Sequence, residues 1–84
     1  MTYTVTIRRR AVEALSTLPV HDFERVRDAI RALGVTPRPS GCKKLVGREG
    51  WRIRVGRYRV IYEVADRDLV VLVLDVGDRK DVYE

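Results

Sequence analysis

The segment from Gly50 to Tyr62, GWRIRVGRYRVIY, constrains the fold more than any other part of the chain. From Trp51 to Val55 its apolar residues alternate with arginines, which is the period-two pattern of a half-buried β-strand. The alternation resumes after Gly56-Arg57, and glycine at the first position of a two-residue loop suits a type II′ turn. The segment therefore predicts a β-hairpin.

A two-residue loop also predicts which residues face one another. Arg54 then lies opposite Arg59, and directly opposite residues share one face of a sheet. One face is apolar and the other basic: Trp51, Ile53, Val55, Tyr58, Val60 and Tyr62 against Arg52, Arg54 and Arg59. Like charges placed opposite one another are destabilising, so the basic face favours a bound anion. The alternative is a solvated face whose arginine stems cover apolar surface.

Composition limits the kinds of chemistry that the chain can perform. The 84 residues predict one small domain, and 17 Lys and Arg against 12 Asp and Glu favour a polyanion or an acidic protein as partner. We interpret the single cysteine, Cys42, as structural and the single histidine, His21, as a surface or capping residue. No disulfide, metal or cofactor is therefore expected. Without a signal peptide or a membrane span, we expect a reducing cytoplasm.

Apolar periodicity predicts a strand and two helices before the hairpin. Tyr3–Ile7 alternates and is rich in β-branched residues, which indicates a first strand. Helical stripes follow over residues 11–18 and over residues 22–33, with Asp22 as the N-cap of the second helix and Gly34 just beyond its end. The short connection predicts an antiparallel helix pair covering the Trp51 face of the hairpin.

The unbroken apolar run Leu69–Leu74 predicts a last, central strand that is buried on both faces. The fold class is then α+β, in the order β-α-α-β-β-β, with an antiparallel sheet and a two-helix hairpin packed on one face. Little chain remains to cover the other face beside Ile61, so we expect an apolar groove there. Lys43-Lys44-Leu45 is interpreted as a short extended segment that places two ammonium groups beside the arginines, or else as a solvated loop.

Three motifs carry a family resemblance. They are PRPxGxKKLxG at residues 37–47, WRIRVGxYRVIY at residues 51–62 and VGxRKDVY at residues 76–83, preceded by the helix end Leu15-x-x-Leu18-Pro19. In this order and spacing the chain resembles a RelE-type toxin of a type II toxin–antitoxin system. The resemblance covers nearly the whole chain, residues 1–84, and implies the RelE-like microbial ribonuclease fold.

The resemblance implies a ribosome-dependent endoribonuclease that cleaves mRNA in the A site through attack by the substrate's own 2′-OH. It also implies a cognate RelB-like antitoxin as partner, and neither metal nor cofactor. The family's catalytic positions correspond to Arg52, Arg54, Arg59, Arg79 and Tyr83. We add RNA contacts by Lys43, Lys44 and Arg57, and an antitoxin-binding groove formed by Ile61, Leu72 and Leu74.

The chain departs from the family pattern in two respects. The best-known members carry lysines where Arg52 and Arg54 stand, and arginine cannot act as a general base because it does not lose its proton. We therefore interpret both arginines as electrostatic clamps and leave proton transfer to Tyr83 or to no strong base. We also expect no helix after Tyr83 to cover the sheet, which leaves the groove to the antitoxin.

Two other functions remain compatible with the sequence. A ParE-like toxin would use the same fold to poison DNA gyrase, and fold alone does not decide function. A non-catalytic RNA-binding or antitoxin-partner module is suggested by the absence of an evident acid–base pair. The set of four arginines and one tyrosine favours the ribonuclease.

Overall fold

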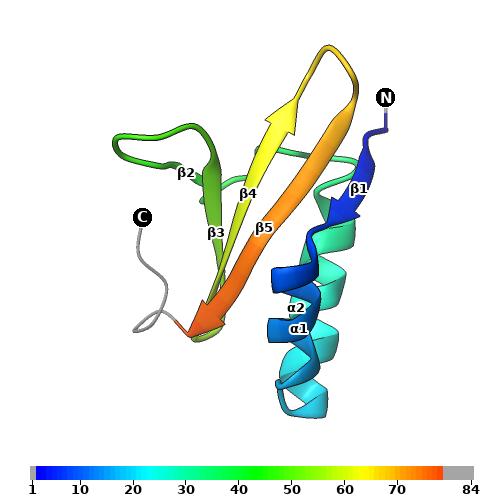
Figure 1. Cartoon of the computed structure of the whole chain (residues 1–84), viewed down its shortest axis with the longest axis vertical. Helices are drawn as coiled ribbons and strands as arrows, with labels where there is room; N and C mark the ends of the chain where they lie inside the picture. Colours follow the sequence, from blue (N-terminus) through cyan, green and yellow to red (C-terminus); the bar gives the residue numbers. More distant parts are fainter. Residues whose placement is uncertain (1, 79–84) are drawn as a thin grey trace.

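The computed structural model describes residues 2–78 of the chain (Figure 1). A strand and two helices come first, followed by four strands. The elements are β1 (Thr4–Ile7), α1 (Arg9–Ser16), α2 (Val20–Ala32), β2 (Lys43–Lys44), β3 (Trp51–Val55), β4 (Tyr58–Ala65) and β5 (Val70–Asp78). No helix in this part of the chain is long and apolar enough to cross a bilayer.

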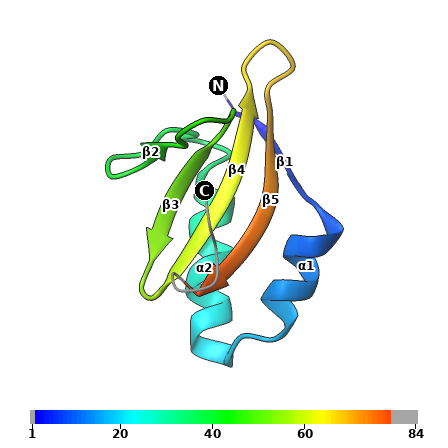
Figure 2. The same ribbon diagram turned by 60° about the vertical axis from the view of Figure 1, so that its left-hand side comes forward.

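The strands form one five-stranded sheet in the order β1-β5-β4-β3-β2 (Figures 1 and 2). The α+β class is confirmed, and β5 lies between two other strands as its apolar run predicts. The sheet is mixed, however, because β1 pairs parallel with β5 while the other three pairings are antiparallel. The direction of β1 follows from the path of the two helices, which return the chain to the same end of the sheet; strand periodicity alone carries no such information.

The predicted hairpin register between β3 and β4 is confirmed. Val55 pairs with Tyr58, Arg54 with Arg59 and so on up to Trp51 with Tyr62. Gly56 has a φ of +61°, and among the described residues Leu69 alone combines a side chain with positive φ. Only the first loop residue is therefore left-handed, as a type II′ turn requires.

The second helix begins earlier than expected, and Asp22 is not its N-cap. Pro19 occupies that position with a φ of −55°, so that α2 starts at Val20. Asp22 lies in the first turn, where a carboxylate is favoured by the helix dipole. Its Oδ2 accepts a hydrogen bond of 2.8 Å from the Tyr58 hydroxyl, which ties the helix start to the hairpin and raises the pKa of Tyr58.

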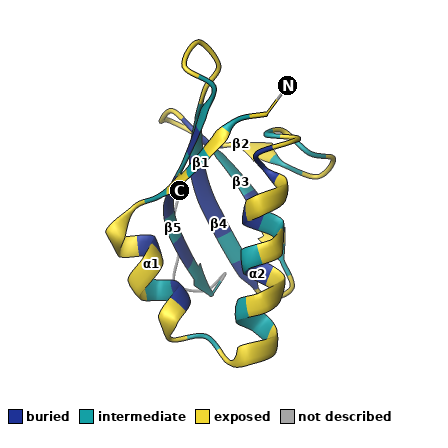
Figure 3. Cartoon of the chain, turned by 90° about the vertical axis from the view of Figure 1, so that its right-hand side faces the viewer, coloured by how far each residue is buried: buried dark blue, intermediate teal, exposed yellow. Residues whose placement is uncertain are grey.

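Both helices pack on the predicted face of the sheet, the one that carries Trp51 and Val60 (Figure 3). The main core joins Val26 and Ile30 of α2 to Val60 and Tyr62 of β4, and all four side chains are at most 1% exposed. The Tyr62 hydroxyl donates to the Pro37 carbonyl at 2.7 Å, and burial raises the pKa of this tyrosine. The polar tip of the largest core residue thus anchors the loop before β2.

Gly34 follows α2 as predicted, but its φ is not positive. The reason for glycine here is close packing: a Cβ would lie 3.1 Å from the Tyr3 carbonyl oxygen and 3.2 Å from a methyl group of Val5. The Tyr3 amide donates to the Gly34 carbonyl at 2.6 Å. Gly34 therefore lets β1 pass directly against the end of α2.

The face of the sheet away from the helices holds a small second core. Leu45 packs there with Ile61 and Leu74, which are 3% and 7% exposed, and half-buried Leu72 contacts this cluster. The prediction of an open apolar groove is therefore wrong for Ile61 and Leu74, because both side chains are buried. The loop before β3 brings Leu45 back onto the sheet, a long-range contact that strand periodicity does not reveal.

Candidate functional site

Four cationic side chains from three strands gather on the sheet face away from the helices. Arg54 of β3 is directly opposite Arg59 of β4, and Lys43 of β2 is opposite Arg52 of β3. Opposite residues share a face, with Cβ atoms about 5 Å apart. We call Lys43, Arg52, Arg54 and Arg59 the basic cluster.

The cluster combines anchored and exposed charges. Arg52 and Arg59 are half-buried, and the Nε atom of each is buried, whereas Arg54 and Lys43 are exposed. A guanidinium whose stem is packed keeps a fixed position and can grip a phosphate through two parallel hydrogen bonds. Arg54 makes no ion pair within residues 2–78. The geometry therefore suits stabilisation of a phosphate on which negative charge increases.

The prediction that Lys43 and Lys44 both lie beside the arginines is correct only for Lys43. Lys43 joins the basic cluster, but Lys44 pairs with Trp51 and lies on the other face, its Nζ 5.7 Å from the centre of the Trp51 ring. Successive residues of a strand point to opposite faces, so a paired strand cannot place both lysines together. Arg57, at the hairpin turn, donates from Nε to Asp78 at 2.7 Å and stacks over Tyr58.

Two residues assigned to catalysis by the resemblance, Arg79 and Tyr83, lie outside the described residues. Their roles remain predictions from the sequence. Of the remaining catalytic assignments, the sheet brings Arg52, Arg54 and Arg59 onto one face. Within residues 2–78 no group of three or more His, Cys, Asp or Glu side chains could hold a metal ion.

A polar network missed by the sequence analysis holds the loop beside Trp51. Arg38 binds both carboxylate oxygens of Asp66, at 3.1 and 2.8 Å, and Asp66 also accepts from the Tyr3 hydroxyl at 2.7 Å. These two donors lower the pKa of Asp66 from 3.8 to about 2, the Arg38 hydrogen bond most. The Arg38 guanidinium stacks over the Trp51 ring at 5.2 Å. The PRP motif therefore serves to position the start of β3.

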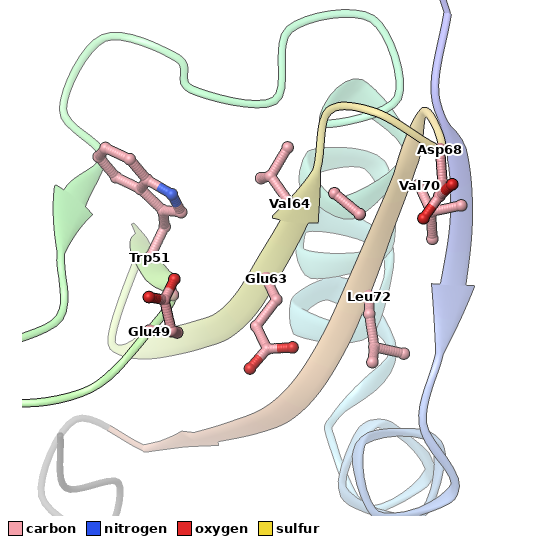
Figure 4. Close-up of a pocket in the computed structure, with 9 residues that line it drawn as sticks. Glu49, Trp51, Glu63, Val64, Asp68, Val70 and Leu72 are labelled. Atoms are coloured by element: carbon pink, nitrogen blue, oxygen red, sulfur yellow. The ribbon is translucent and has the colours of Figure 1, made fainter.

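A pocket of about 370 Å³ lies at the other end of the face that carries the basic cluster (Figure 4). It lies beside the start of β3. Trp51, the first residue of β3, pairs with Tyr62, and β4 runs on past this pair to Ala65. Its lining combines carboxylates with apolar groups: Glu49, Gly50, Trp51, Glu63, Val64, Ala65, Asp68, Val70 and Leu72. Period-two spacing from Arg59 through Ile61 to Glu63 is the sequence signal for the position of Glu63 on this face.

A second pocket, of about 450 Å³, lies along the outer edge of β3. Ala29 and Ala32 of α2 form one wall, and the loop at Pro39–Gly41 forms another. Lys43, Arg52 and Arg54 also line it, so the basic cluster reaches the edge of the sheet.

Comparison with known proteins identifies the family. The model of the family described as ParE toxin of type II toxin–antitoxin system, parDE, matches residues 5–83. The chain belongs to this toxin family. The resemblance inferred from the three sequence motifs is thus confirmed, and the basic cluster is part of a toxin.

Solved structures and a sequence relative place the toxin close to proteins named RelE. It is 34% identical to a chain of the archaeal RelE–RelB complex from Pyrococcus horikoshii, with a TM-score of 0.85 over 98% of this chain and 100% of that chain. For the RelBE2 toxin–antitoxin complex of Mycobacterium tuberculosis the identity is 28% and the TM-score 0.82, over 94% and 100%. A protein of Methanocaldococcus jannaschii that bears the name RelE1 is 28% identical, over 100% of this chain and 98% of its own.

Proposed function

We propose that the toxin is a ribosome-dependent endoribonuclease that enters the A site and cleaves mRNA there, which stops translation in the cytoplasm. The basic cluster is the observation that carries this proposal. Three strands hold four cations on one open face, and Arg54 lies directly opposite Arg59. Such an arrangement suits a ligand that brings negative charge to fixed positions, as the phosphates of RNA do.

The proposed chemistry is attack by the 2′-oxygen of a nucleotide on its own 3′-phosphate. The new O–P bond forms as the bond to the 5′-oxygen of the next nucleotide breaks, leaving a 2′,3′-cyclic phosphate and a 5′-hydroxyl. Negative charge accumulates on the non-bridging oxygens, and Arg54 and Arg59 are close enough across the strands to contact the same phosphate. Arg52 and Lys43, one cross-strand pair further along, would hold the neighbouring phosphate.

Proton transfer requires groups outside the basic cluster, because arginine remains protonated. We assign removal of the 2′-OH proton to the phenolate form of Tyr83 and stabilisation of the departing 5′-oxygen to Arg79, and a water molecule gives that oxygen its proton. A tyrosine side chain, with an ordinary pKa of about 10, is mostly protonated at neutral pH, so its phenolate is scarce. The ribosome must therefore supply orientation of the 2′-OH for in-line attack, an effect worth several kcal/mol. This requirement predicts poor cleavage of free RNA.

Mapping the 5′ ends of cellular RNA after brief expression tests this activity. Wild-type toxin should generate new 5′-hydroxyl ends inside translated reading frames, and Arg59→Ala should abolish them. Arg67→Ala is the matched control, because Arg67 is exposed in the turn between β4 and β5 and makes no ion pair within the described residues. Growth arrest without new RNA ends would overturn the proposal.

We further propose a RelB-like antitoxin as the partner that holds the toxin inactive. The P. horikoshii relative was solved as a RelE–RelB complex, and the M. tuberculosis relative as the toxin–antitoxin complex RelBE2. An antitoxin that covers the basic cluster with carboxylates would compete directly with RNA. Co-expression with a small open reading frame found beside the toxin gene tests this: a stable complex without ribonuclease activity is expected, and independent purification of the two proteins would count against it.

A gyrase-inhibiting activity is the second candidate, favoured by the ParE description of the matching family. A supercoiling assay with purified gyrase separates the two. Inhibition of gyrase together with intact mRNA would replace the ribonuclease proposal with this one.

A further inference from the structure

The open face of the sheet is divided by charge. Arg59 and Glu63 lie on the same face of β4 and are four residues apart, about 13 Å along the strand. The Arg59 end carries the basic cluster, and the Glu63 end carries the pocket lined by Glu49, Glu63 and Asp68. Between them lie Ile61 and Leu74, both buried and packed with Leu45, and half-buried Leu72 borders the pocket. The face therefore runs from cationic through apolar to anionic.

The carboxylates of the pocket are available to a ligand. Glu49, Glu63 and Asp68 make neither an ion pair nor a side-chain hydrogen bond within residues 2–78. In Figure 4, Glu63 and Leu72 extend from neighbouring strands toward the same side of the sheet, and Glu49 lies across from Glu63. Glu63 is directly opposite Leu72 in the register, so a carboxylate and an aliphatic side chain form adjacent parts of one wall.

These features select the chemistry of the occupant. RNA is disfavoured, because its phosphates would meet three carboxylates. A metal ion is disfavoured too, since the carboxylates are too dispersed to coordinate one. A volume of about 370 Å³ is near the lower end of the range for binding pockets, roughly 300–1,000 Å³. A lysine or arginine side chain with an aliphatic neighbour matches both the charge and the apolar wall.

We propose that this pocket anchors the antitoxin through a lysine or arginine that binds Glu63 and Glu49, next to an aliphatic residue that packs on Leu72 and Val70. The proposal rests on the proposed toxin–antitoxin function and specifies how the partner is oriented. The same segment continues past Leu72 and past the buried cluster of Leu45, Ile61 and Leu74, and places its carboxylates on the basic cluster. An occupant with one sign of charge would fit only one end.

The distance between the two ends gives the spacing of charges in the antitoxin. About 13 Å corresponds to four residues of an extended segment, or to eight or nine residues of a helix. The antitoxin should therefore carry a basic residue and an acidic residue at one of these separations, with an aliphatic residue next to the basic one. RNA would use only the basic end, so mRNA and antitoxin overlap at Arg54 and Arg59 but not at Glu63.

Calorimetric titration of the purified toxin with an antitoxin that co-purifies with it tests the proposal. Glu63→Gln and Glu49→Gln should each weaken the complex about five- to tenfold, and the loss should shrink at high salt. Glu24→Gln is the matched control, an exposed glutamate on α2. Glu63→Lys should weaken binding further, and replacing the matching lysine or arginine of the antitoxin by glutamate should restore it. Leu72→Ala, with its unfolding measured in parallel, tests the aliphatic contact.

The possible results separate this proposal from the function on which it rests. Equal affinity of wild type, Glu63→Gln and Glu49→Gln overturns the anchor while the antitoxin partnership stands. No binding by the wild type overturns the partnership itself. Glu63→Gln should also cleave mRNA on programmed ribosomes at the wild-type rate. A cleavage defect there would assign the pocket to RNA and overturn the proposal.

Discussion

Gly50 precedes β3 and the basic cluster, and its replacement by alanine tests how the loop places that strand. The residue is buried, with a φ of +121°, and its carbonyl accepts from the Leu45 amide at 3.0 Å. An added Cβ would lie 2.9 Å from the Tyr62 carbonyl oxygen and 3.0 Å from a methyl group of Leu45. Gly50→Ala therefore combines an unfavourable backbone conformation with a clash against a buried strand.

Two other glycines separate these effects. Gly47 has a φ of +75° and open space around its Cβ position, so Gly47→Ala tests the conformational cost alone. Gly34→Ala tests crowding alone, since its φ is not positive but a Cβ would meet the Tyr3 carbonyl at 3.1 Å. A left-handed alanine costs about 1–2 kcal/mol, partly offset by the lower entropy of its unfolded chain.

Gly50→Ala should cost more than either control. Its φ is far from the left-handed minimum near +57°, which places the conformational cost in the upper part of the range of about 1–3 kcal/mol. Overpacking against a buried strand adds about 1–3 kcal/mol. We expect a total of about 3–4 kcal/mol, against about 1 kcal/mol for Gly47→Ala. A domain of this size has a free energy of unfolding of roughly 4–13 kcal/mol, so the loss is large.

Denaturant unfolding followed by Trp51 fluorescence measures these differences, because Trp51 is the only tryptophan. The free energy of unfolding should fall with denaturant concentration at a similar slope in all variants, so that differences between their midpoints report differences in stability. If Gly50→Ala is no less stable than Gly47→Ala, the contact with Tyr62 does not constrain the loop and the packing argument fails.

Three further predictions concern the site and its support. Arg59→Ala should slow single-turnover cleavage on programmed ribosomes about 10²-fold, and near wild-type rates would show that the assigned site is wrong. Arg54→Lys should slow it less than tenfold, because the lysine charge retains most of the attraction to phosphate. Trp51→Ala should lower the free energy of unfolding by about 2–3 kcal/mol, less than for a fully buried tryptophan. An unchanged midpoint in denaturant unfolding followed by circular dichroism would contradict the packing of its half-buried ring. Asp66→Asn should destabilise the protein at pH 7; because the folded-state pKa is lowered from 3.8 to about 2, the difference from wild type should fade as the pH falls through this interval. A difference independent of pH in unfolding experiments would contradict the ion pair with Arg38.

The hairpin can be predicted in full because its determinants are local. Period-two alternation assigns each side chain to a face, and Gly56 fixes the loop length, so the pairing of Arg54 with Arg59 follows from sequence alone. The helix stripes likewise identify the face that they cover. Local sequence patterns are therefore sufficient to place Arg52, Arg54 and Arg59 together on one face.

Features that depend on the long loop could not be predicted in the same way. Lys44 faces away from the basic cluster because the loop returns Gly50 to Leu45, which sets the register between β2 and β3. The same return buries Ile61 under Leu45. Both outcomes depend on contacts between residues that no periodicity connects. The parallel pairing of β1 with β5 depends in the same way on the path through the two helices.

The electrostatics of the face connect the proposed activity with its control. Arg54 and Arg59 lie directly opposite each other, so two positive charges point to the same place on the open face. A phosphate in the transition state and a carboxylate of the antitoxin would both be attracted to these charges, so the residues that stabilise the reaction also bind the inhibitor. Ligand binding to the folded state alone stabilises it, by about 4 kcal/mol at a thousand times the dissociation constant. The antitoxin should therefore raise the stability of the toxin while blocking it, and the anionic end at Glu63, where RNA gains nothing, gives the antitoxin an advantage that RNA does not share.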